Sequence, residues 1–107
     1  MALRATAAES RYMGRVAALP CVLCVHLGMA QEGRTHCHHI KKAPALESAS
    51  SHWLVVATCH EHHQGTSGIH GLGTKGFYTR YRLDELDLLA MTIEALNARL
   101  VQVMKVA

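Results

Sequence analysis

The sequence predicts one α+β domain, in which a β-hairpin and a short helix are flanked by an N-terminal and a C-terminal helix. Three observations support this fold class. A Cys-x-x-Cys pair and a Cys-x-x-His pair stand on either side of the segment expected to form the hairpin. Helical apolar periodicity occupies both ends of the chain, while strand-like apolar and β-branched runs lie in its middle. The length of 107 residues suits one domain with a modest core.

We expect this single domain, residues 1–107, to consist of an N-terminal helix at 1–19, a core at 20–72 and C-terminal helices at 73–107. Apolar residues recur at helical spacing through the first segment, and Pro20 ends it. The chain therefore passes directly from a helix into Cys21. The segment from Cys21 to Cys24 is expected to form a knuckle, followed by a polar loop around 28–33.

The two expected strands are residues 34–40 and 53–58. Alternation along the first places one set of side chains (His36, His38 and Ile40) on one face and a second set (Cys37 and His39) on the other. The second strand is a nearly continuous apolar run, which indicates burial. Residues 41–51 carry loop-forming residues, so the strands are expected to pair as an antiparallel hairpin with a long loop.

Residues 59–64 are expected to form a short helix or turn, and the five glycines of residues 65–76 predict a loop. A short helix is expected over 75–82. Asp84 has the character of an N-cap for a long final helix. That helix carries an apolar stripe typical of a core or self-association helix, made of Leu86, Leu89, Ala90, Ile93, Leu96, Leu100 and Val103.

Composition narrows the classes of function. Half of the residues are hydrophobic, which favours a folded domain over a disordered one. A net charge of +3 permits nucleic-acid binding without requiring it, and an aromatic content of 5% argues against a base-stacking platform. The sequence has no opening signal peptide and no apolar run of membrane-spanning length. We therefore expect a cytoplasmic protein without membrane association.

The cysteines predict a structural Zn²⁺ site. Two pairs with two intervening residues have the spacing of tetrahedral half-sites, and together they comprise Cys21, Cys24, Cys59 and His62. In a reducing cytoplasm, metal binding explains the four cysteines better than two disulfides do. His63 could replace His62, in which case the roles of these two residues would exchange. Cys37 has no neighbouring ligand and is expected to pack within its strand.

The histidines suggest a second, reactive site. Seven of the nine histidines lie between His36 and His63. A double histidine at a strand end, beside a helix that carries another histidine, suits a hydrolase with one metal ion. One imidazole would take a proton from water, and the others would hold a divalent cation. Alone, a double histidine is weak evidence, because satisfied core or surface histidines are commoner; the neighbouring zinc framework favours the metal interpretation.

The order of these motifs resembles the HNH endonucleases, also called ββα-metal or His-Me finger nucleases. The shared order is Cys-x-x-Cys, His-His-Ile, an apolar strand and Cys-x-x-His-His. More narrowly, three segments are similar to phage and prophage Ref-type nucleases, which depend on RecA: Cys59-His-Glu-His-His-Gln64, Gly68-Ile-His-Gly71 and Phe77-Tyr-Thr-Arg-Tyr81. The resemblance covers the chain from about Pro20 to Leu89.

The resemblance implies a metal-dependent DNA endonuclease that hydrolyses phosphodiester bonds in phage or prophage recombination or DNA processing, within a bacterial host. It assigns His39 as the general base that activates water. It assigns His38 and His63 as ligands of a catalytic Mg²⁺ or Mn²⁺, and His70 as a further ligand or a phosphate contact. The middle asparagine of the family motif is absent, and His52, at the corresponding strand start, is the candidate to orient His39.

Several cations are expected to contact DNA, namely Arg34, Lys41, Lys42, Lys75, Arg80 and Arg82. For the adjacent Lys41 and Lys42, a solvated loop is an equally good interpretation. We expect binding through the DNA backbone that weakens steeply with salt. The resemblance also implies a RecA filament as a partner, and the last helix could support a homo-oligomer. The alternative function is a non-catalytic zinc module that binds nucleic acid or a protein.

Overall fold

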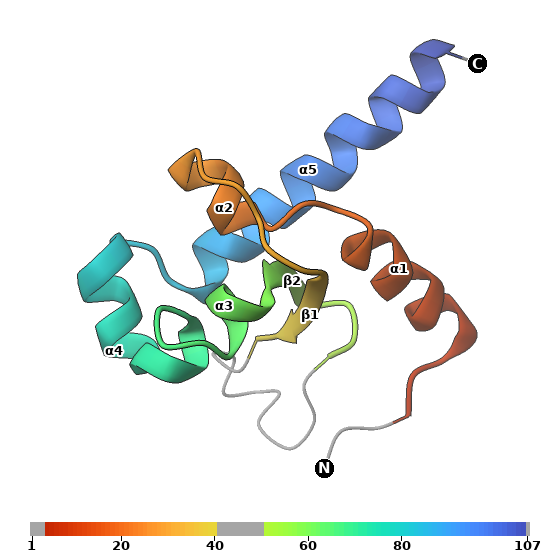
Figure 1. The fold of residues 1–107 in the computed structure, drawn as a ribbon. Helices are drawn as coiled ribbons and strands as arrows, with labels where there is room; N and C mark the ends of the chain where they lie inside the picture. The colour runs from red at the N-terminus through yellow and green to blue at the C-terminus, as the bar shows by residue number, and fades with distance from the viewer. Residues whose placement is uncertain (1–3, 41–50, 107) are drawn as a thin grey trace.

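The computed structural model describes residues 4–40 and 51–106. Its elements follow the chain in the order α1 (Ala7–Ala17), α2 (Val22–Leu27), β1 (Thr35–His39), β2 (Val55–Cys59), α3 (His60–His63), α4 (Ile69–Tyr81) and α5 (Glu85–Val106), as drawn in Figure 1. The expected α+β class, a hairpin followed by a helix and flanked by helices, is confirmed. Most of the loop predicted at 41–51 lies outside the described residues, as do the predicted DNA contacts Lys41 and Lys42.

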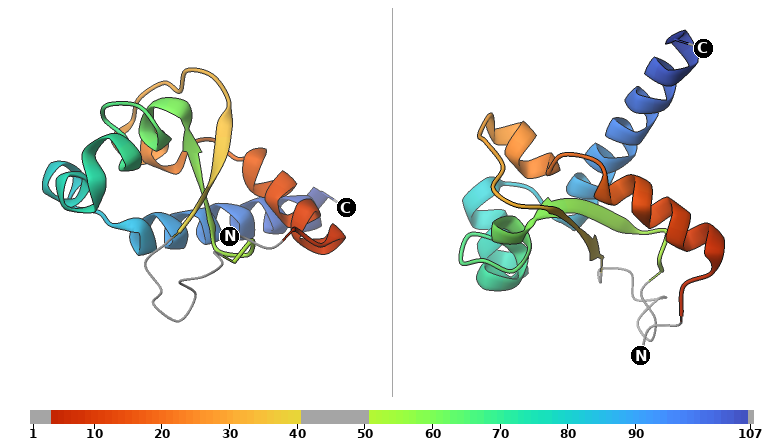
Figure 2. Two further views of the ribbon diagram at one scale, coloured as in Figure 1. Left: turned by 90° about the horizontal axis from the view of Figure 1, so that it is seen from below. Right: turned by 45° about the vertical axis from the view of Figure 1, so that its right-hand side comes forward.

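The hairpin is antiparallel, with Thr35 opposite Cys59 and His39 opposite Val55. Every residue of β2 is buried, as the apolar run predicted. The predicted alternation of β1 is also confirmed, because His38 packs against rings from α3 and α4 while Cys37 points the other way. The Cys37 thiol donates a hydrogen bond of 3.3 Å to the carbonyl of Met13 in α1. In Figure 2, α1 and α4 lie on opposite sides of the hairpin.

Helix α1 begins later than its apolar pattern predicted, because a capping box defines its start. The Thr6 hydroxyl accepts from the Glu9 amide at 3.1 Å, and the Glu9 carboxylate accepts from the Thr6 amide at 2.7 Å. These two hydrogen bonds satisfy amides that the first helical turn leaves free. Val16, near the other end of the helix, has no exposed surface and anchors α1 to the core.

The predicted knuckle at Cys21 is the start of the short helix α2. The Cys21 sulfur accepts from the Cys24 amide at 3.4 Å, so the first ligand also caps the helix. The Gln31 side chain returns from the following loop and accepts from the Cys21 amide at 2.7 Å. Gly28, at a φ of +68°, ends α2 in the left-handed conformation that glycine adopts without strain.

The glycine-rich segment predicted as a loop over 65–76 is helical from Ile69 onward, with a kink at Gly73. Here the glycines permit close packing between elements. A Cβ atom on Gly71 would lie 2.1 Å from the Gly65 carbonyl oxygen, and one on Gly68 would lie 2.4 Å from that of Glu61. Helix α4 can therefore begin directly against the end of α3.

Helix α5 buries one edge of the predicted apolar stripe, where Leu89 and Leu96 pack against the core, together with residues outside the stripe. Of the stripe residues, Leu86, Ile93 and Leu100 are 54%, 45% and 58% exposed. Among the α5 side chains that the structure describes, those that are fully or almost fully buried are Glu85, Leu88 and Thr92. Apolar periodicity missed this face because two of its three members are polar.

Helix α5 is capped at its start and packs on the sheet with its first half, while its end projects from the fold. The predicted N-cap is confirmed, because the Asp84 carboxylate accepts from the Asp87 amide at 3.0 Å and the Asp87 carboxylate accepts from the Asp84 amide at 2.9 Å. The first half of the helix packs on β2, where Thr92 accepts from the Ala57 amide at 3.3 Å. Its C-terminal part extends away from the other elements in Figures 1 and 2.

Two candidate metal centres

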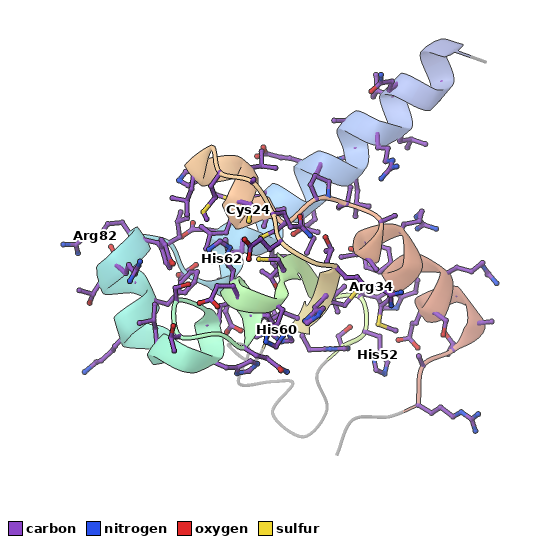
Figure 3. All side chains as sticks on the ribbon, in the orientation of Figure 1. Cys24, Arg34, His52, His60, His62 and Arg82 are labelled. Carbon is purple, nitrogen blue, oxygen red and sulfur yellow. The ribbon has the colours of Figure 1, made fainter. Side chains whose placement is uncertain are left out.

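The first candidate centre contains the four predicted zinc ligands, Cys21, Cys24, Cys59 and His62. The His62 Nδ1 atom lies 3.6 Å, 3.5 Å and 3.4 Å from the sulfurs of Cys21, Cys24 and Cys59 respectively. The Cys24 and Cys59 sulfurs are 3.8 Å apart. In Figure 3 the labelled Cys24 and His62 lie close together, between α2 and α3.

These distances fit a tetrahedral Zn²⁺ site. Ordinary Zn–S and Zn–N bond lengths place two tetrahedral sulfurs about 3.8 Å apart and a sulfur and a nitrogen about 3.6 Å apart. All four ligands are buried, which is typical of a closed structural site. The cysteines are free thiols, so the disulfide alternative is wrong. Of the two neighbouring histidines, His62 is the one that joins the cysteines.

The chemistry of the thiols also favours a cation. Burial, with smaller contributions from the neighbouring sulfurs of Cys21 and Cys59, raises the pKa of Cys24 to about 12. Burial likewise raises the pKa of Cys59. The thiols of Cys24 and Cys59 therefore hold their protons more strongly than exposed cysteines do. A divalent metal ion supplies a positive charge and is bound by the thiolates.

The second candidate centre joins three histidines from three elements, His38 of β1, His63 of α3 and His70 of α4. One ring nitrogen from each lies within 4.8 Å of the others. The ring centroids are 5.0 Å apart for His38 and His63, and 4.9 Å apart for His63 and His70. Exposure rises from buried His38 through half-buried His63 to exposed His70. This centre therefore opens toward solvent, whereas the cysteine centre is closed.

His38 is held by a residue that the sequence did not identify as part of the site. Its Nε2 atom lies 2.5 Å from the carboxylate of Glu85, which is itself buried at the start of α5. The other ring nitrogen, Nδ1, is buried and has no hydrogen-bond partner among the described residues. In the sequence, Glu85 is only one of several acidic residues at a helix N-terminus, where such residues are common.

His63 is kept in the neutral form that can bind a metal. Burial lowers its pKa to about 4, and the neighbouring imidazoles of His38, His70, His36 and His60 act in the same direction. The His36 and His63 Nδ1 atoms are 3.2 Å apart, a contact that sequence reasoning also missed. The alternation of the strand places His36 on the same face as His38, and this pattern could have indicated that His36 lies near the site.

Three imidazoles have a definite metal preference. Imidazole suits Zn²⁺, Ni²⁺, Cu²⁺ and Fe²⁺, whereas Mg²⁺ prefers oxygen ligands in near-octahedral geometry. Three histidines with an open position are also one of the ligand sets of catalytic zinc. Of the two ions expected from the sequence, Mg²⁺ is therefore the poorer fit, and a transition metal suits the donors better.

His39 does not join this three-histidine group. It lies on the opposite face of β1, where its Nε2 atom is 2.9 Å from Nδ1 of His52. The expected contact between these two side chains is thus present. Burial lowers the pKa of His39 below 6.5, with His52 and then His38 as smaller contributions. The adjacent histidines of the motif therefore face two different surroundings.

The predicted DNA-contacting cations within the described residues are all exposed, and most belong to α4 or its C-cap. They are Arg34, Lys75, Arg80 and Arg82. In Figure 3, Arg82 lies at the far end of α4 and Arg34 lies on the side of α1. Helix α4 therefore presents His70 and three cations, while Arg34 stands apart from them.

Comparison with known proteins gives no relative. No protein-family model matches the chain, and neither a curated protein nor a solved structure matches it. Within the described part of the chain, no helix has the length and apolarity needed to cross a membrane.

Proposed function

We propose that this protein is a metal-dependent DNA endonuclease of the HNH type, which hydrolyses phosphodiester bonds. The proposal is carried by one observation, the open cluster of His38, His63 and His70 beside a closed centre of three cysteines and His62. Closed four-ligand sites are typical of structural metal, and three-histidine sites with access to solvent are typical of catalytic metal. The resemblance of the motif order to HNH nucleases likewise favours one structural and one catalytic metal site.

In this proposal the three histidines hold a divalent transition-metal ion, and the exposed side of His70 admits the DNA phosphate. When bound, such an ion stabilises the negative charge that develops on the phosphate during hydrolysis. The cations of α4 contact neighbouring phosphates of the DNA backbone. We propose the cytoplasm of a bacterial host as the setting, with a phage or prophage role in recombination or DNA processing.

We propose His39 as the general base, because it directly follows His38 and is held by His52 in place of the missing asparagine. His36 is the competing candidate, since it lies on the same face as His38 and contacts His63. For His39 to receive a proton from water, its Nε2 atom has to exchange the His52 contact for the water. If His39 is the base, His39→Ala should be inactive. If His36 is the base, His36→Ala should be inactive instead.

The test is cleavage of supercoiled plasmid by protein that retains its structural zinc, with Zn²⁺, Ni²⁺, Mn²⁺ or Mg²⁺ added separately and EDTA as the control. We expect His39→Ala and His70→Ala to abolish nicking while circular dichroism and zinc content stay unchanged. His26→Ala, an exposed histidine on α2, is the matched control and should cleave like the wild type. Undiminished cutting by His39→Ala, together with loss in His36→Ala, would transfer the base role to His36.

The rival function is a non-catalytic zinc module that binds nucleic acid or a protein. It is favoured if the wild-type protein binds DNA but cleaves it with none of these metals. A RecA filament and a second copy of the chain remain proposed partners, the first from the resemblance alone. Adding RecA filaments to the cleavage assay separates a protein that needs this partner from one that cannot cleave.

A further inference from the structure

We propose that Glu85 is a positioning residue, which fixes the tautomer and orientation of His38 so that its Nδ1 atom faces the metal ion. The inference rests on the proposed metal site of His38, His63 and His70. It adds to that site a buried carboxylate from α5, and thereby gives the last helix of the fold a role in the metal centre.

The tautomer follows from the contact between the two side chains. Glu85 and His38 are both buried, and the carboxylate oxygen lies 2.5 Å from Nε2. An ionised carboxylate can only accept a hydrogen bond, so the proton of the imidazole resides on Nε2. The lone pair is then on Nδ1, which is buried and unpartnered among the described residues. A buried acceptor without a partner costs free energy, and a cation shared with His63 and His70 would remove that cost.

This arrangement has a general physical basis. A histidine that binds metal through one nitrogen usually donates its other N–H to a carboxylate or carbonyl, which sets the ring orientation and raises the basicity of the ligand. Carboxylates are rarely buried unless they are paired. Glu85 is 7% exposed although its neighbour Leu86 is 54% exposed, so α5 turns its first charged residue toward the core and an apolar residue toward solvent.

Capping does not explain why a glutamate occupies this position. The N-cap interaction of α5 is made by Asp84 and Asp87, which accept hydrogen bonds from one another's amides. Glu85 lies between them and points to His38 instead.

The test measures binding of a second metal ion to protein that already holds one zinc. Co²⁺ is titrated into the wild type, Glu85→Gln and Glu94→Gln, an exposed glutamate in the same helix. We expect Glu85→Gln to weaken binding of the second ion by about 10- to 100-fold and to alter its visible spectrum, with the first zinc retained. Glu94→Gln should bind like the wild type. Glutamine removes the charge and can donate to Nε2, which would stabilise the wrong tautomer.

A second measurement does not depend on a folded variant. Nitrogen-15 NMR of the wild type with only its first zinc should show His38 protonated at Nε2; protonation at Nδ1 would overturn the proposal. Unchanged Co²⁺ affinity in Glu85→Gln would also overturn it. A wild type that binds no second ion contradicts both the positioning role and the nuclease, whereas a second ion weakened in Glu85→Gln but without DNA cleavage supports the positioning role and contradicts the nuclease alone.

Discussion

At the scale of single residues, two pairs of adjacent histidines divide their members between different surroundings. In α3, His62 turns toward the buried thiols while His63 turns toward His38 and His70. In β1, His38 and His39 point to opposite faces. The geometry is local, because neighbouring side chains diverge by about 100° on a helix and about 180° on a strand. A double histidine in the sequence therefore supplies one side chain to each of two different surroundings.

Replacing a zinc ligand should unfold the protein. Cys24→Ser removes one of four buried ligands, and structural zinc in small domains contributes about 10–16 kcal/mol at neutral pH, as much as the whole net stability of a typical domain. We expect loss of bound zinc and of the circular dichroism spectrum. The control is Cys37→Ser, in which the hydroxyl can still donate to the Met13 carbonyl. Equal zinc content in both variants would remove Cys24 from the ligand set.

The thiol of Cys37 should react slowly and with a shifted pH dependence. Burial raises its pKa above the ordinary 9.0, so the reactive thiolate forms at higher pH than in an exposed cysteine. We expect iodoacetamide to modify one thiol in the zinc-loaded protein, at a rate that is low at pH 8 and rises beyond pH 9. Mass spectrometry identifies the modified cysteine. Rapid modification of Cys21, Cys24 or Cys59 before chelation would contradict the zinc site.

At the scale of elements, the turn between α3 and α4 decides whether His70 reaches the other histidines. The carboxylate of Glu61 accepts from the Ser67 amide at 2.9 Å and from the Ser67 hydroxyl at 2.6 Å, which ties this turn together. Tyr81 then donates to the Ser67 carbonyl at 2.7 Å from the far end of α4. These contacts and the close approach of Gly71 to Gly65 fix where α4 begins.

A methyl group at Gly71 should damage the second metal centre selectively. In Gly71→Ala the new Cβ would overlap the Gly65 carbonyl oxygen, so α4 has to move and carry His70 with it. We expect the first zinc to be retained and Co²⁺ binding at the second centre to weaken. The control is Gly14→Ala, where the added carbon meets nothing within 4 Å and should stabilise α1 by about 0.5–1 kcal/mol. Equal Co²⁺ affinity in the two variants would contradict this role of the turn.

At the scale of the whole molecule, the hairpin separates the cation-bearing α4 from α1, and the two candidate centres lie at the α3 end of the hairpin. DNA that reaches His70 is therefore expected to contact α4 before it contacts α1. The protruding part of α5 exposes Leu100, Val101 and Met104, and these apolar side chains are available for the proposed self-association.

The salt dependence of DNA binding should report the cations of α4. Each phosphate contact contributes about −0.9 to the slope of log K against log salt. We expect Lys75→Gln and Arg80→Gln each to reduce the magnitude of that slope by about one, without changing zinc content. The control is Arg11→Gln on α1, which is equally exposed and should leave the slope unchanged. The slope is measured by fluorescence anisotropy over a range of salt concentrations. A larger change of slope in Arg11→Gln than in the α4 variants would place the DNA on the other side of the hairpin.

The parts of the site that depend on local geometry could be predicted from residue spacing. Cys-x-x-Cys and Cys-x-x-His place their members within one turn, and strand alternation separates His38 from His39, so these could be predicted from spacing. The histidine excess likewise indicated a second cluster. The Thr6 and Glu9 spacing of the α1 capping box is also visible in the sequence, although the apolar pattern alone does not show where the helix begins.

Packing between distant elements sets which further residues complete the site. Glu85 lies 47 positions after His38 and meets it because α5 packs across the hairpin. The sequence could not indicate this contact, since a periodic pattern predicts a face from apolar residues and the buried face of α5 includes a glutamate and a threonine. The contact of His39 with His52, in contrast, was expected from the resemblance in motif order. Local spacing selects the ligands, and packing between elements selects what orients them.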